Sequence, residues 1–190
     1  MSDWKRQTNI DVMDPRVDIL LEMLARYRSE LKDALEKVPV DRREVRSGAA
    51  WSAANVIEHL ASTERAVTGL VSRFLAEAAP RLGTAPFDRA QFDRNIDVRQ
   101  FLDRTVRIKG SQPSGLLSAG EAWQNLKASR LNLLAVVEEA RGRRLEDFAR
   151  SHPTGQDLNG YQWIAFVAVH EGRHAAQLEE IAGSVQAGRA

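Results

Sequence analysis

The chain has 190 residues, with 27 Lys and Arg against 26 Asp and Glu, so its formal net charge is +1. This near balance excludes the basic surface that nucleic-acid binding normally needs. The sequence contains no cysteine, which excludes disulfides, thiolate metal ligands and a thiol nucleophile. Its length and its hydrophobic fraction of 43% predict one globular domain over residues 1–190, with a core of about residues 14–183.

The N-terminus, MSDWKRQTNIDVMD, is polar and lacks the apolar stretch of a secretory signal. The longest apolar run, WIAFVAV at residues 163–169, is far shorter than the roughly 20 residues that cross a bilayer. We therefore expect a soluble, cytoplasmic protein that engages neither nucleic acid nor membrane.

Four segments carry apolar residues at the three- and four-residue spacing of a helix. They cover about residues 14–38, 52–79, 118–141 and 158–181. Asp14, Ser52 and Ser118 are good N-cap residues, and Ser118 forms a capping box with Glu121. Gly183 is predicted to cap the end of the last helix.

The connection of residues 80–117 is rich in proline and glycine, and it is predicted to contain only a short helical piece around residues 97–106. No stretch alternates between apolar and polar residues for long enough to predict a strand. Four long helices with one long connection predict an all-α four-helix bundle, with the long crossover between helices two and three.

Residues 170–174, HEGRH, place His170 and His174 one turn apart on the same face of the last helix, with Glu171 between them. The spacing H-E-x-x-H is the signature of zinc metalloproteases. Such proteases take their third ligand downstream, but the metzincin positions here hold Gln177 and Glu180, and only 16 residues follow His174. We therefore reject the protease interpretation.

The second helix carries a further histidine, His59, that can complete the site if it faces His170 and His174. Three neutral imidazoles leave coordination positions open, as in catalytic metal sites, and imidazole suits Zn, Ni, Fe or Cu. The alternative is a hydrogen-bonded network of histidines in the core. His152 precedes Pro153 in a loop, and we expect a structural loop residue or at most a residue at a pocket rim.

Residues one or two turns from these histidines are candidates for substrate contact: Asn55, Trp163 and Gln177. Each has a simpler alternative, because Asn55 is the third residue of its helix, Gln177 can hydrogen-bond a neighbouring side chain, and Trp163 can belong to the core. Glu171 is the best candidate for a catalytic general base. Its alternatives are a supporting carboxylate or a solvated side chain.

Two motifs resemble those of the DinB/YfiT-like superfamily. Residues 51–60, WSAANVIEHL, are similar to the family's W-S-x-x-x-x-x-x-H-L at the start of helix two. Residues 152–177 contain H-P-x-x-G, then a tryptophan, then H-E-x-R-H-x-x-Q, similar to the family's closing motif. The resemblance covers nearly the whole chain, from helix one to Ile181. The crossover from Pro80 to Leu117 departs from familiar members and is rich in Arg and Asp, as in FDRAQFDR at residues 87–94. It can form part of a substrate pocket or a dimer contact, so substrate specificity does not transfer.

The resemblance implies a four-helix bundle with a divalent metal, usually Zn or Ni with Fe or Mn as further candidates, held by His59, His170 and His174. It also implies a homodimer. Members are described as metal-dependent hydrolases, and some are thiol-dependent S-transferases or isomerases. A transferase of this kind would bring a low-molecular-weight thiol as cosubstrate, since the chain has no cysteine. The alternatives are a non-catalytic bundle that binds a metal or small ligand, and a purely structural bundle.

Overall fold

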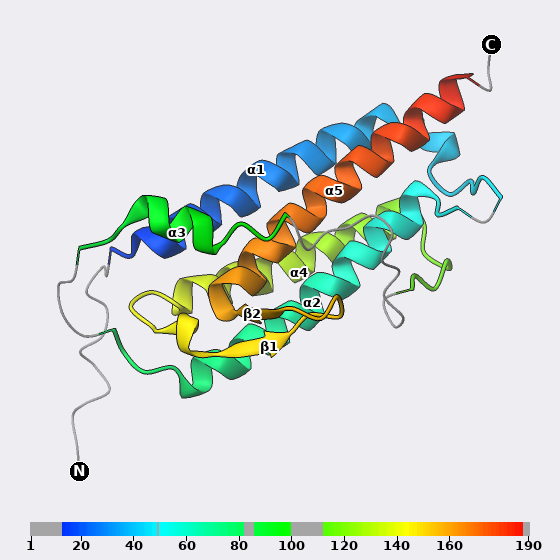
Figure 1. Cartoon of the computed structure of the whole chain (residues 1–190). Coiled ribbons are helices and arrows are strands. Elements are labelled where there is room, and N and C mark those ends of the chain that lie inside the picture. Colours follow the sequence, from blue (N-terminus) through cyan, green and yellow to red (C-terminus); the bar gives the residue numbers. More distant parts are fainter. Residues whose placement is uncertain (1–12, 49, 82–85, 100–111, 188–190) are drawn as a thin grey trace.

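The structure of the protein, a computed structural model, describes residues 13–48, 50–81, 86–99 and 112–187. Four long helices form a bundle (Figure 1): α1 (Pro15–Lys37), α2 (Ala53–Glu77), α4 (Ala119–Glu139) and α5 (Gly160–Ala187). The shorter elements are the 3-10 turns at Val40–Arg42 and Leu145–Asp147, the helix α3 (Arg89–Asn95), and the strands β1 (Ala149–Ser151) and β2 (Asp157–Asn159). The all-α prediction is confirmed.

Three of the four long helices, α1, α2 and α4, begin at the predicted caps. The Asp14 side chain accepts a hydrogen bond from the Arg16 N–H at 3.1 Å, and Ser52 and Ser118 each head a capping box. The end of the last helix was predicted wrongly. Gly183 does not cap α5, which continues to Ala187, because Gly183 does not adopt the positive φ that a capping glycine needs.

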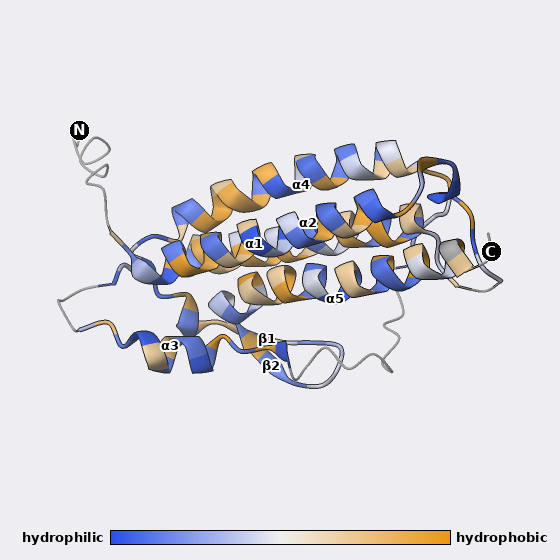
Figure 2. Cartoon of the chain, turned by 90° about the horizontal axis from the view of Figure 1, so that it is seen from above, coloured by the Kyte–Doolittle hydropathy of each residue, from blue (hydrophilic) through white to orange (hydrophobic). Residues whose placement is uncertain are grey.

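Two short elements also differ from the prediction. The helix in the crossover is α3, which is capped by the Asp88 side chain and ends before the predicted piece at residues 97–106 begins. The part of that predicted piece beyond residue 99 lies outside the described residues. Strands β1 and β2 were not predicted. They pair antiparallel with Arg150 opposite Leu158, and three residues are too few to show an alternation in the sequence. Figure 2 shows α3 and this hairpin on the α5 side of the bundle, away from α4.

The core is divided into two apolar clusters by a layer of charge. In the packing of the bundle, α2 lies against α4 and α1 against α5. Arg28, Glu64, Arg130 and Glu171, one from each long helix, lie between the two clusters along the chain. None of the described helices has the long uncharged apolar stretch that crossing a bilayer requires.

These four side chains form a balanced ionic network. Arg28 Nη2 lies 2.6 Å from Glu171 Oε1 and 3.1 Å from Glu64 Oε2. Arg130 Nη2 lies 2.8 Å from Glu64 Oε2 and 2.9 Å from Glu171 Oε2. Ser129 donates a further hydrogen bond to Glu64 at 2.8 Å. Two cations and two anions compensate one another, which a buried charge requires.

Candidate metal centre and adjoining cavity

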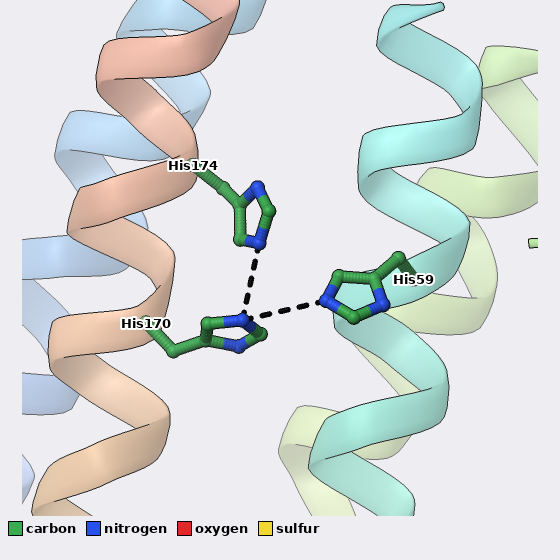
Figure 3. A group of neighbouring side chains, drawn as sticks. All are labelled: His59, His170 and His174. Atoms are coloured by element: carbon green, nitrogen blue, oxygen red, sulfur yellow. Dashed lines mark hydrogen bonds between the residues drawn. The ribbon is translucent and has the colours of Figure 1, made fainter. Parts of the chain in front are cut away.

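Three buried histidines from two helices converge at one point of the bundle interior. His170 and His174 are one turn apart on α5, and their side chains point towards His59 on α2 (Figure 3). Their ring nitrogens lie within 4.8 Å of one another. The candidate ligand set expected from the sequence is therefore assembled in the structure.

The spacing of the nitrogens fits a metal ion. His170 Nε2 lies 3.3 Å from His59 Nε2 and 3.1 Å from His174 Nε2. Two nitrogens bound tetrahedrally to one ion at about 2.0–2.1 Å are separated by about 3.4 Å. A chain of hydrogen bonds alone explains the geometry less well, because a single ring nitrogen carries either one proton or one lone pair.

The protonation state of the cluster also suits coordination. Burial, together with the charge of His59, lowers the pKa of His174 to about 3, and burial lowers the pKa of His170 well below 6.5. Both rings are therefore neutral at physiological pH. Gln177 Oε1 lies 2.7 Å from His174 Nδ1. Because an amide oxygen only accepts, Nδ1 carries the proton and Nε2 keeps its lone pair for a ligand bond.

Aromatic rings hold the three imidazoles in place. The Phe166 ring stacks on His170 at a centroid distance of 5.1 Å, and the Trp51 ring lies 4.9 Å from His59 and 6.3 Å from His174. Packing of this kind restricts the imidazoles to few orientations before any ligand binds, which lowers the entropy cost of coordination.

The cluster opens onto a cavity of about 870 Å³ between α2, α5 and the hairpin. Apolar and aromatic side chains form much of its wall: Trp51, Val67, Leu70, Trp163 and Phe166. Within the described part of the chain, no Asp or Glu lines this cavity. Its volume is that of a site for a small organic molecule.

The residues proposed for substrate contact fall in different places. Trp163 and Gln177 line the cavity, and Gln177 also makes the hydrogen bond to His174 that its alternative interpretation anticipated. Asn55 is not among the described cavity-lining residues. Its side-chain oxygen instead accepts from the Ser52 N–H at 3.3 Å in the capping box of α2.

Glu171 is placed away from the cavity. One residue turns a helix by about 100°, which directs Glu171 to a different face from His170. Its carboxylate lies between Arg28 and Arg130 in the ionic layer, and it does not line the cavity. This placement argues against the general-base hypothesis and in favour of a supporting, charge-compensating role.

The hairpin side of the site was anticipated only in part, through the alternative that placed His152 at a pocket rim. His152 lines the cavity, and its ring lies 4.8 Å from that of Phe166. The H-P-x-x-G motif was its only signal. Arg73 and Arg150, which also line the cavity, were not singled out at all. No local pattern marks them, since one lies late on α2 and the other on an unpredicted strand.

Comparison with known proteins agrees with this architecture. The family model described as the DinB superfamily matches residues 20–178. A protein of Bacillus subtilis (strain 168) named "Uncharacterized protein YuaE" is 29% identical over 148 residues, which are 74% of this chain and 82% of that protein. No solved structure is significantly similar to the chain.

Proposed function

The chain belongs to the DinB superfamily, and from this premise we propose that it is an enzyme whose divalent metal ion is held by His59, His170 and His174. The observation that carries the proposal is the convergence of three buried ring nitrogens at ligand spacing, beside a cavity large enough for a substrate. A closed structural site would use four protein ligands, whereas three leave a position free.

When bound, a divalent ion supplies Lewis acidity and lowers the pKa of a coordinated water or thiol. The protein's own groups have simpler tasks. Gln177 holds His174 in the tautomer that presents Nε2, and Phe166 and Trp51 pack against the ligand rings. The apolar wall of the cavity excludes water from the reacting groups and binds the body of the substrate.

Between the two reaction types, we favour transfer of a low-molecular-weight thiol over hydrolysis. A thiol has an ordinary pKa of about 8.5, so deprotonation of a thiol needs less help from a protein base than deprotonation of water. The described residues that line the cavity include no carboxylate to act as such a base. Hydrolysis is the second candidate, with the same metal ligands.

The test is elemental analysis of purified, untagged protein after incubation with Zn and Ni. We expect near-stoichiometric metal in the wild type, loss of that metal in His59→Ala, and retention in His152→Ala, because His152 lines the cavity outside the histidine cluster. Wild-type protein that retains metal should then consume a low-molecular-weight thiol in the presence of an electrophile.

The absence of bound metal in the wild type would contradict the proposal and favour a structural histidine network. In that case His59→Ala should remove about 1–3 kcal/mol of unfolding free energy, because it strands buried polar partners. Metal in stoichiometric amount without any turnover would instead favour a non-catalytic metal-binding bundle. Analytical ultracentrifugation tests the homodimer, which stays a prediction.

A further inference from the structure

The cavity beside the histidine cluster is elongated along α2. The α2 residues that line it recur at helical spacing from His59 through Val67 and Leu70 to Arg73. Arg73 lies fourteen positions after His59, and at 1.5 Å per residue their backbones are about 21 Å apart along the helix. The cavity therefore has a histidine end, a mainly apolar middle, and a second end at Arg73.

A second arginine lies at the end marked by Arg73. Arg150 of β1 lines the cavity, and Phe148, two residues earlier, stacks on Phe74 of α2 at a centroid distance of 5.6 Å. Because Phe74 follows Arg73 directly, this contact places β1 beside the last turns of α2. The two arginines reach this end of the cavity from different elements.

Within the described part of the chain, no acidic side chain pairs with either arginine. The side chains of Arg73 and Arg150 make no hydrogen bond or ion pair there, and no described acidic residue lines the cavity. Arg28 and Arg130 of the ionic layer, in contrast, each contact two carboxylates. Two uncompensated guanidinium groups at the rim of an apolar cavity make its potential positive and attract an anion.

The wall between the two ends adds two buried polar atoms without partners in the described structure. Trp163 Nε1 and His152 Nε2 are both buried and unpaired in the described structure, and both residues line the cavity. Thr154 Oγ1 donates to Gln156 Oε1 and therefore accepts from His152 Nδ1 at 2.7 Å, which leaves His152 Nε2 as an acceptor. Buried polar groups without partners are rare in native proteins, and an acceptor oxygen of a ligand would satisfy the Trp163 N–H.

We propose that Arg73 and Arg150 form an anion subsite, and that the ligand of this cavity is an elongated amphipathic molecule with a carboxylate or phosphate at one end. Its apolar segment lies along Val67, Leu70 and Phe166, and its other end approaches the histidine cluster. The assignment of that other end as the reacting end rests on the proposed function. The anion subsite itself does not require a metal.

The test is calorimetric titration of the full chain with four probes of equal chain length: octanoate, octyl phosphate, octanol and octylammonium. We expect octanoate or octyl phosphate to bind, and the tighter of the two identifies the anion. Arg73→Gln and Arg150→Gln should each weaken this binding about ten- to a hundredfold, the effect of one lost charge-assisted hydrogen bond. Arg94→Gln, on α3 outside the cavity, is the matched control.

Charge reversal sharpens the experiment, since Arg73→Glu should shift the preference from octanoate to octylammonium. Equal binding of octanol and octanoate, or absence of anion binding, would overturn the proposal. The proposal would also be overturned if octanoate affinity were lost in His59→Ala but unchanged in both arginine variants. The carboxylate would then lie at the histidine end of the cavity. Arginine-dependent anion binding by a protein that holds no metal would support the subsite and reject the proposed function.

Discussion

Gln177 sets the tautomer of His174 through one hydrogen bond of 2.7 Å between Oε1 and Nδ1. Gln177→Leu removes this acceptor, and we expect metal affinity to fall about 10- to 100-fold, the usual effect of losing the partner of a ligating histidine. Gln177→Glu keeps an acceptor oxygen and should restore most of the affinity. Competition with a chelator of known affinity measures both variants.

If Gln177→Leu binds metal as tightly as the wild type, the hydrogen bond to Gln177 does not set the tautomer of His174 that binds the metal. Gln124→Leu is a suitable control, because Gln124 is exposed on α4 and does not line the cavity.

Gly172, the central residue of HEGRH, allows α1 and α5 to approach closely. A Cβ atom at this position would lie 2.6 Å from two ring atoms of Tyr27. Gly172→Ala should therefore lower the unfolding free energy by about 1–3 kcal/mol, the cost of overpacking, although alanine has the better helix propensity. Urea unfolding provides the measurement.

Gly183 on the same helix is the matched control, since a Cβ atom there would meet no atom within 4 Å. Gly183→Ala should stabilise the protein by up to about 1 kcal/mol through helix propensity alone. Equal stabilisation by the two substitutions would show that the contact between Gly172 and Tyr27 exerts no constraint.

At the scale of the helices, the ionic layer ties all four long elements together. Arg130 is buried and contacts both Glu64 and Glu171, so Arg130→Met leaves two buried carboxylates with less compensation. We expect a loss of about 3–5 kcal/mol of unfolding free energy, as for other broken buried pairs. Arg26→Met, which breaks an exposed pair with Glu30, should cost less than about 1 kcal/mol.

Glu171→Gln separates the structural role of this residue from a catalytic one. The substitution should reduce stability while metal content stays stoichiometric, because Glu171 contacts Arg28 and Arg130 and lies outside the histidine cluster. A Glu171→Gln variant with wild-type stability and no turnover would instead support the hypothesis that Glu171 is the general base.

The long helices were predictable because each shows many turns of apolar periodicity, and three of them begin at a capping residue that the sequence marks. The short elements were not, since α3 spans seven residues and each strand three, and such lengths show too few repeats of any period. Helical spacing also predicted that His170 and His174 share a face. It could not identify the partners of Glu171, because Arg28 lies 143 residues away in the chain.

At the scale of the whole molecule, the histidine cluster joins α2 to α5 and exists only in the folded chain. A metal that binds only the native state at a thousandfold excess over its Kd adds about 4 kcal/mol to the unfolding free energy. Without metal, His170 and His174 are buried neutral bases that the unfolded chain would expose to protons. Stability of the metal-free protein must therefore depend on pH.

Burial lowers the pKa of His152, His170 and His174, that of His174 to about 3. In the unfolded chain the pKa values of these side chains return to about 6.5. Below that pH the unfolded state therefore binds protons that the folded state does not. The unfolding free energy should therefore fall as the pH drops from 7 to 5. Each histidine that stays neutral in the folded state contributes up to about 1.4 kcal/mol per pH unit to the slope of the unfolding free energy against pH.

Urea unfolding of the metal-free protein at pH 7, 6 and 5 measures this slope. The pKa values of Glu58 and Asp97 are lowered, because hydrogen bonds from Ser114 and Gly115 outweigh the burial of Glu58 and Arg99 pairs with Asp97, so both titrate below this range. Burial raises the pKa of Glu171, so the slope is compared between two proteins that share this carboxylate. His174→Gln removes one titrating group, so its slope should be smaller by about 1.4 kcal/mol per pH unit. Equal slopes in the two proteins would mean that His174 binds protons equally in the folded and unfolded states, which would contradict the lowered pKa of this buried side chain.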